Sequence, residues 1–118
     1  MIQILLHLWG DYITQNDWMA TNKTQNTAKG WVACLIHVTL YSLPFLFICS
    51  FEAFVVIFTT HFFIDKFRLA KYLVQLKNFS FTPTGFPPTT PLFISVWVTI
   101  IVDNILHVTI NYLSITFL

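Results

Sequence analysis

Histidine and aspartate are the side chains in this 118-residue sequence best suited to chemistry, and they lie within its apolar stretches. Each apolar stretch carries one histidine, and three of the four histidines have an aspartate four residues away. The set comprises His7 with Asp11, His61 with Asp65, His107 with Asp103, and His37 without such a partner. Residues four apart on an α-helix project from the same face, one turn from each other. Each pair can therefore present an imidazole and a carboxylate to one point.

Imidazole and carboxylate groups together are the ligands expected for zinc, manganese or iron. Helical bundles hold such ions when ligands converge from several helices. Because seven candidates exceed the needs of one ion, the sequence predicts a centre for one or two divalent transition-metal ions. Its predicted ligands are His7, Asp11, His37, His61, Asp65, Asp103 and His107. Asp11 and Asp65 are also the candidates for a catalytic general base.

A purely structural role for these pairs stays open as an alternative. Histidines in membrane helices commonly form hydrogen bonds across a bundle, and a histidine–aspartate pair one turn apart can satisfy its own polar groups. The placement of such pairs on three separate segments, with a fourth histidine on another, favours a shared site.

The composition indicates what surrounds the elements that position these residues. Hydrophobic residues make up 56% of the chain and charged residues only 9%, whereas a soluble domain is about 25% charged. So few charges cannot cover a water-facing surface, so the lipid bilayer is the expected surrounding. The chain is long enough for one domain. We therefore predict an all-α fold, with residues 1–118 forming an integral membrane bundle of about four helices, the first one short.

The apolar pattern places four predicted helical segments along the chain. Residues 2–13 are too few to cross about 30 Å of hydrocarbon alone, which takes about 20 residues. Residues 31–50 are long enough, with a kink expected at Pro44. A hairpin at residues 50–52 leads into a third helix that continues to residue 77, and the last helix covers residues 92–118. The polar stretch 16–30 and the proline-rich stretch 78–91 are predicted loops.

The basic residues predict the orientation of this bundle. They lie in the first loop and after the third segment, on one side of a four-segment bundle; they are Lys23, Lys29, Lys66, Arg68, Lys71 and Lys77. The positive-inside rule makes that side cytoplasmic, and the expected location is a bacterial inner membrane. The net charge of +1 is uninformative about a nucleic-acid partner, but the lack of a basic patch with interleaved aromatic residues argues against one.

Four sequence blocks resemble a known family. They are H-L-W-G-D-Y-I-T-Q-N-D-W-M-A at residues 7–20, L-I-H-V-T-L-Y around His37, H-F-F-I-D at residues 61–65, and D-N-I-L-H at residues 103–107. Together they resemble small bacterial and phage membrane proteins grouped as domain of unknown function 3307. The resemblance implies a membrane location and makes a phage origin an expectation. The pattern is also loosely similar to that of membrane-bound metal-dependent hydrolases, which use histidine and aspartate on helices.

Three functions are consistent with these features. The leading hypothesis is a membrane-embedded metal-dependent hydrolase, or a related enzyme, whose substrate is lipid-derived, such as a phosphoester or an amide. The second is a metal-ion or proton conduit formed by a homo-oligomer. The third is a phage-encoded protein that acts on a host membrane protein, with the polar cluster fixing helix packing. The sequence has neither a G-x-S-x-G motif nor a Walker loop, which disfavours serine-hydrolase and nucleotide-driven chemistry.

Overall fold

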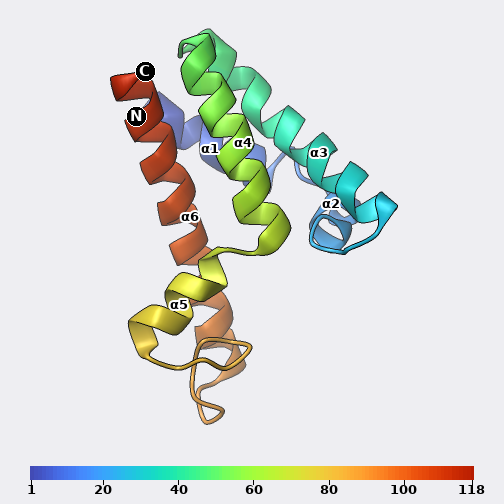
Figure 1. The fold of residues 1–118 in the computed structure, drawn as a ribbon, viewed down its shortest axis with the longest axis vertical. Coiled ribbons are helices and arrows are strands. Elements are labelled where there is room, and N and C mark those ends of the chain that lie inside the picture. The colour runs from blue at the N-terminus through green and yellow to red at the C-terminus, as the bar shows by residue number, and fades with distance from the viewer.

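The computed structural model describes residues 1–118 and contains helices but no strands (Figure 1). Its elements are α1 (Ile2–Tyr12), α2 (Asp17–Asn22), α3 (Ala28–Ser42), the 3-10 helix η1 (Leu43–Phe47), α4 (Phe51–Phe67), α5 (Ala70–Asn78) and α6 (Leu92–Phe117). The all-α class predicted from the sequence is therefore confirmed. The chain forms six α-helices rather than about four.

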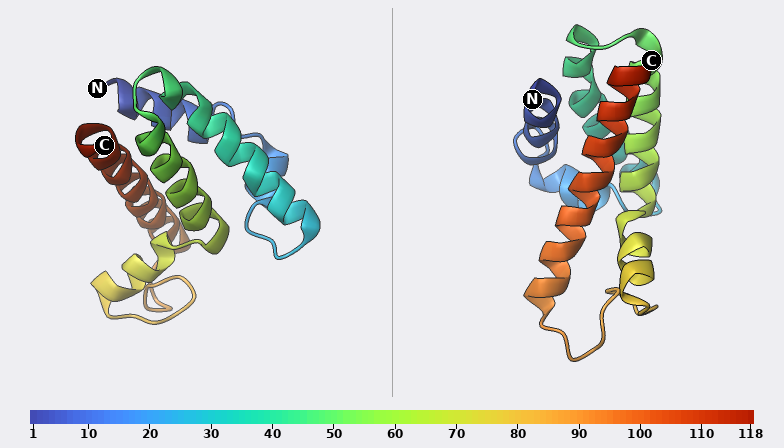
Figure 2. Two further views of the ribbon diagram at one scale, coloured as in Figure 1. Left: turned by 45° about the horizontal axis from the view of Figure 1, so that its top comes forward. Right: turned by 90° about the vertical axis from the view of Figure 1, so that its left-hand side faces the viewer.

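Four of the six α-helices form a closed ring. Helix α3 packs against α4, α4 against α6, α6 against α1, and α1 against α3. Figure 2 shows α4 and α6 running alongside each other, with η1 joining α3 to α4 at one end of the bundle. The two remaining helices lie outside the ring, α2 against α3 and α5 against α6. The four predicted segments thus correspond to the ring, α2 is an addition, and α5 forms the second part of the predicted third helix.

Local sequence explains where the boundaries differ from the prediction. Asn16 accepts a hydrogen bond from the Met19 amide at 2.9 Å. This N-cap starts α2 inside the polar stretch that was predicted as a loop. The predicted continuous helix over residues 51–77 is wrong, because the chain turns at Arg68, which has left-handed backbone angles. Pro44 lies at the start of η1, where the expected kink becomes a change to 3-10 geometry.

The interior of the ring is unusually polar and its exterior is apolar. All four histidines and Asn111 are buried, with no more than 2% of their surface exposed. The buried apolar cluster is small and consists of Tyr41, Phe45 and Ile57. Large aliphatic and aromatic side chains instead cover the outside of α1, α3 and α6. A soluble protein shows the opposite arrangement.

Two segments are long and apolar enough to cross a membrane by length and composition. They are Ala28–Phe47, which joins α3 and η1 over 20 residues, and Leu92–Phe117, which is α6 with 26 residues. Helix α1 has only 11 residues and is too short to cross alone at about 1.5 Å per residue. The structure therefore supports membrane location through two helices.

Candidate metal centre

Four ligand atoms from three helices meet in the interior of the ring. Helix α1 supplies Asp11, α3 supplies His37, and α4 supplies His61 and Asp65. The two Nε2 atoms of the histidines are 3.1 Å apart. Asp65 Oδ2 lies 3.0 Å from that of His37 and 3.3 Å from that of His61. Asp11 Oδ1 lies 3.3 Å and 3.4 Å from the same two atoms. We call these four residues the tetrad.

The spacing in the tetrad fits a tetrahedral metal site. Bonds of about 2.0–2.1 Å, typical of zinc with nitrogen and oxygen ligands, place neighbouring ligand atoms about 3.3–3.4 Å apart. The five distances given above run from 3.0 to 3.4 Å. Asp11 Oδ1 is also buried without a hydrogen-bond partner, which is costly for a carboxylate oxygen. A divalent cation would satisfy this oxygen, so the residues present fit the predicted metal.

Helix α6 adds a second group of ligands beside the tetrad. Asp103 Oδ2 lies 3.5 Å from His107 Nε2, and both residues lie close enough to Asp11 to share an ion with it. His107 Nε2 is also 3.1 Å from Asp65 Oδ1. Asp65 therefore faces the two histidines of the tetrad with Oδ2 and faces His107 with Oδ1. Six of the seven side chains predicted from the sequence are thus brought together.

His7 lies beside these groups but belongs to neither, because both its nitrogens have other partners. Nε2 is 2.7 Å from Asn104 Oδ1, and an amide oxygen only accepts, so Nε2 carries the proton and donates it. Nδ1 then accepts from the Tyr41 hydroxyl at 2.8 Å, and Tyr41 accepts from Asn111 at 2.7 Å. Asp11 Oδ2 is 3.5 Å from His7 Nδ1. His7 therefore belongs to a directed hydrogen-bond chain that runs beside the centre and contains none of its ligands.

Three members of this chain were not predicted from the sequence, although a periodic signal was present. Tyr41 follows His37 by four residues, and Asn104 and Asn111 lie three before and four after His107. Residues at these spacings share a helix face. A search for polar residues one turn from each histidine would have identified all three.

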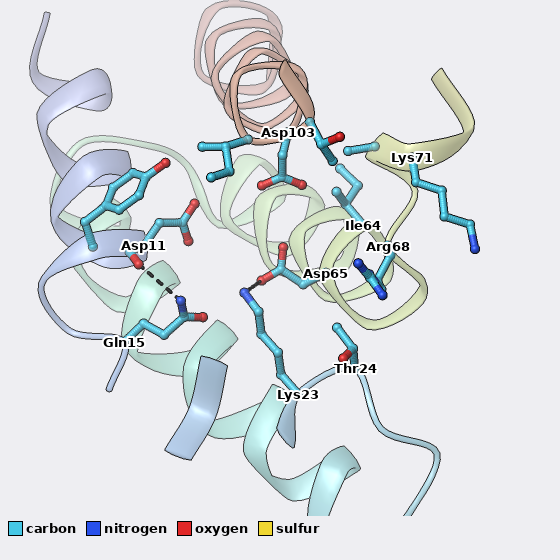
Figure 3. A pocket seen from close by; sticks show the side chains of 13 residues that line it. Asp11, Gln15, Lys23, Thr24, Ile64, Asp65, Arg68, Lys71 and Asp103 are labelled. Carbon is cyan, nitrogen blue, oxygen red and sulfur yellow. Dashed lines mark hydrogen bonds and ion pairs between the residues drawn. The ribbon is translucent and has the colours of Figure 1, made fainter. Parts of the chain in front are cut away.

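One lysine reaches the centre from the connection between α2 and α3, and a second lysine at the end of α4 holds that connection. Lys23 Nζ lies 2.7 Å from Asp65 Oδ2 (Figure 3). Burial alone would lower the pKa of Lys23, but the Asp65 carboxylate outweighs it and raises that pKa above its ordinary value. Lys66 donates to the backbone carbonyls of Lys23 and Gln25, at 3.2 and 2.6 Å. Lys66 therefore fixes the segment that carries Lys23.

A cavity of about 340 Å³ opens beside the centre (Figure 3). Three carboxylates and three cations line it, namely Asp11, Asp65, Asp103, Lys23, Arg68 and Lys71. Ligands from both groups therefore face a space that a small molecule can enter.

A family model described as "Protein of unknown function (DUF3307)" matches residues 1–117 of the chain. The chain belongs to this family. The match confirms the resemblance carried by the four sequence blocks. No curated protein and no solved structure matches the chain. For this DUF3307 member, the geometry of the centre is therefore the basis for assigning a function.

Proposed function

We propose that the protein is a membrane-embedded metal-dependent hydrolase. The observation that carries this proposal is the tetrad, in which ligand atoms from α1, α3 and α4 converge at the edge lengths of a tetrahedral site. Zinc, manganese and iron all accept this donor set. The adjoining cavity gives a substrate access to the ligands.

The side chains of the centre divide the work of hydrolysis. Asp11, His37, His61 and Asp65 would hold one ion, and Asp103 with His107 would hold or brace a second. A divalent ion held there would supply Lewis acidity, and it would lower the pKa of a water molecule that it binds in addition to these side chains. Asp103 has the most exposed side chain of the three aspartates, at 34%, and lines the cavity. It is therefore better placed than Asp11 or Asp65 to take a proton from water.

The apolar exterior and the two long helices support a membrane location. The start of α3, the end of α4 and α5 carry the cations, and they lie at the end of the bundle away from η1 and both termini (Figure 1). By the positive-inside rule this end would face the cytoplasm of a bacterium. The centre lies near it, because Asp65 is in the last turn of α4. A substrate would then enter from the cytoplasmic headgroup region.

Elemental analysis of detergent-purified protein tests this function. We expect at least one transition-metal ion per chain in the wild type. His61→Ala should lose that ion and stay folded, because it removes one of four ligands. Asp103→Ala should lower the metal content only if a second ion is held. His7→Gln is the matched control, since His7 lies outside both ligand groups, and it should keep the wild-type metal content.

A wild-type protein that is folded but binds no transition metal, even after incubation with zinc, manganese and iron, would contradict the proposal. The cluster would then have a structural role. Metal bound equally well by the wild type and by His61→Ala would also contradict it, because the ion would lie elsewhere. Hydrolytic activity that follows metal content across the variants would support the proposal.

A further inference from the structure

Two of the cations that line the cavity form no ion pair within the chain; the ammonium of one of them, Lys71, lies 5.1 Å from the centre of the Tyr72 ring. Arg68 lies at the end of α4 and Lys71 in the first turn of α5, and both line the cavity. The guanidinium of Arg68 forms no hydrogen bond or ion pair with protein groups, whereas Lys23 is paired with Asp65. Figure 3 shows the Lys71 side chain extending away from the three carboxylates. Two cations are thus free to bind an anion next to the centre.

The backbone at Arg68 makes its identity notable. Its φ of 53° and ψ of 49° place it in the left-handed region at the end of a helix. Glycine is the residue that fits this position without steric cost. A long cationic side chain in a sparsely populated conformation is a feature that clusters at functional sites. The backbone geometry therefore does not explain why residue 68 is an arginine. The position of its side chain in the lining of the cavity does.

A second cavity of about 340 Å³ continues from the first along α6. The two cavities share Arg68, Lys71, Thr99 and Ile100. The second cavity has no acidic residue in its lining. Besides the two cations, its lining includes the hydroxyls of Thr84, Ser95 and Thr99, which donate to backbone carbonyls. Two cations without a carboxylate are suited to an anion rather than a cation.

We propose that the substrate is a phosphate ester whose phosphate group is held by Arg68 and Lys71 while its phosphorus faces the metal ligands. This inference rests on the proposed hydrolase function and names its substrate class. Arginine matches phosphate geometry because its donors form a planar fork. In the reaction, a water oxygen forms a bond to phosphorus and the bond from phosphorus to the ester oxygen breaks. Asp103 accepts the proton that water loses and returns it to the departing ester oxygen, which leaves as an alcohol.

Calorimetric titration of the zinc-loaded, detergent-solubilised chain with inorganic phosphate tests this assignment. Arg68→Gly should weaken phosphate binding about tenfold or more, because it removes charge-assisted hydrogen bonds, and it suits the backbone. Lys71→Met should weaken binding in the same direction. Two variants serve as matched controls and should bind phosphate like the wild type. Phe79→Gly changes the other non-glycine residue with positive φ, and Lys77→Met removes a cation outside both cavities.

The outcomes separate this proposal from the metal centre. Zinc bound at the wild-type level together with equal phosphate affinity in Arg68→Gly and wild type would overturn the phosphate assignment and leave the hydrolase proposal standing. Loss of zinc binding in the wild type would overturn the proposed function instead. Each titration is therefore run with and without zinc, so that the effect of Arg68 on phosphate affinity is measured separately from the effect of the metal.

A parallel measurement identifies the source of the phosphate. Phosphatidylcholine vesicles with and without phosphatidic acid are offered to the same variants. Binding that requires both phosphatidic acid and Arg68, without comparable affinity for inorganic phosphate, assigns the phosphate to a lipid headgroup. Arg68-dependent affinity for inorganic phosphate alone assigns it to a water-soluble ester. Affinity for neither probe would contradict the proposal.

Discussion

Asp65 has more partners than any other side chain in the centre. Its Oδ2 atom faces His37, His61 and Lys23, and its Oδ1 atom faces His107. The ammonium group of Lys23 and a divalent ion would compete for the same oxygen, because both are cations. Lys23 therefore has the position of a cation that neutralises the buried carboxylates when no ion is bound.

Lys23→Met should raise the affinity of the centre for zinc about tenfold, because the competing positive charge is removed. The same change should lower the free energy of unfolding of the metal-free protein by about 2 kcal/mol, because a buried carboxylate loses its partner. Competition with a zinc-binding dye and thermal unfolding in detergent measure the two effects. Lys29→Met removes a cation that has no contact with Asp65 and serves as control. Weaker zinc binding in Lys23→Met would show that Lys23 assists the ion.

The sequence predicted most of the centre at this scale because helical spacing carries the information. Asp11, His61, Asp65, Asp103 and His107 lie in pairs one turn apart, which places each pair on one face before any packing is known. The hydrogen bonds of His7 with Tyr41 and Asn104 depend on which helices are neighbours in the ring, and the helical spacing does not reveal this. Lys23 comes from a connection without periodicity, so no pattern pointed to it.

At the scale of the elements, the connection between α2 and α3 determines where Lys23 lies. Thr27 caps α3 by accepting a hydrogen bond from the Gly30 amide at 3.0 Å. A Cβ atom on Gly30 would collide with the backbone carbonyl of Gln25 and lie 2.8 Å from that of Asn22. These contacts are with backbone atoms, which cannot swing aside. The close return of the chain over α3 therefore requires glycine at this position.

Gly30→Ala should destabilise the protein by about 1–3 kcal/mol, because the added methyl group forces the connection away from α3. The displaced connection should also withdraw Lys23 from Asp65 and change zinc affinity in the same direction as Lys23→Met. Thermal unfolding and the zinc-dye competition measure both effects. An unchanged melting temperature would mean that the connection shifts freely.

Element boundaries were predicted well where apolar runs define them and poorly where single residues decide. The ends of α1 and α6 match the predicted segments within two residues. The break at Arg68 was missed because arginine is a good helix former. Its left-handed backbone ends α4 through local hydrogen bonds, from the Arg68 amide to the Asp65 carbonyl and from the Leu69 amide to the Ile64 carbonyl. The short α2 was missed because it has only six residues and lies in a stretch that is mostly polar.

At the scale of the whole molecule, polar groups lie inside and apolar groups outside. On α6, His107 and Asn111 are buried, whereas Ile101 and Ile105 are exposed. In water this arrangement would leave a large apolar surface exposed, which is a mark of membrane or partner contact. The composition predicted this surrounding, but not that histidines would fill so much of the interior.

Ile105→Lys should reduce the fraction of protein that stays in membranes after an alkaline carbonate wash. A lysine at the centre of a membrane-spanning helix costs about 2.5–3.5 kcal/mol on insertion scales. Leu76→Lys is the matched control, because Leu76 has the same exposed fraction of 58% as Ile105 but lies in α5, outside the two long segments. Equal membrane retention of both variants would place α6 outside the hydrocarbon.

The double-sided contact of Asp65 has a consequence for how the centre would fill. An ion held by the tetrad would fix the plane of this carboxylate and so preset the oxygen that faces His107. Binding of an ion by the tetrad would thereby favour binding of a second ion beside His107, so that the two ions would bind one after the other rather than independently. Replacing Asp65 should therefore abolish metal binding both in the tetrad and beside His107, whereas replacing Asp103 should affect only the site beside His107.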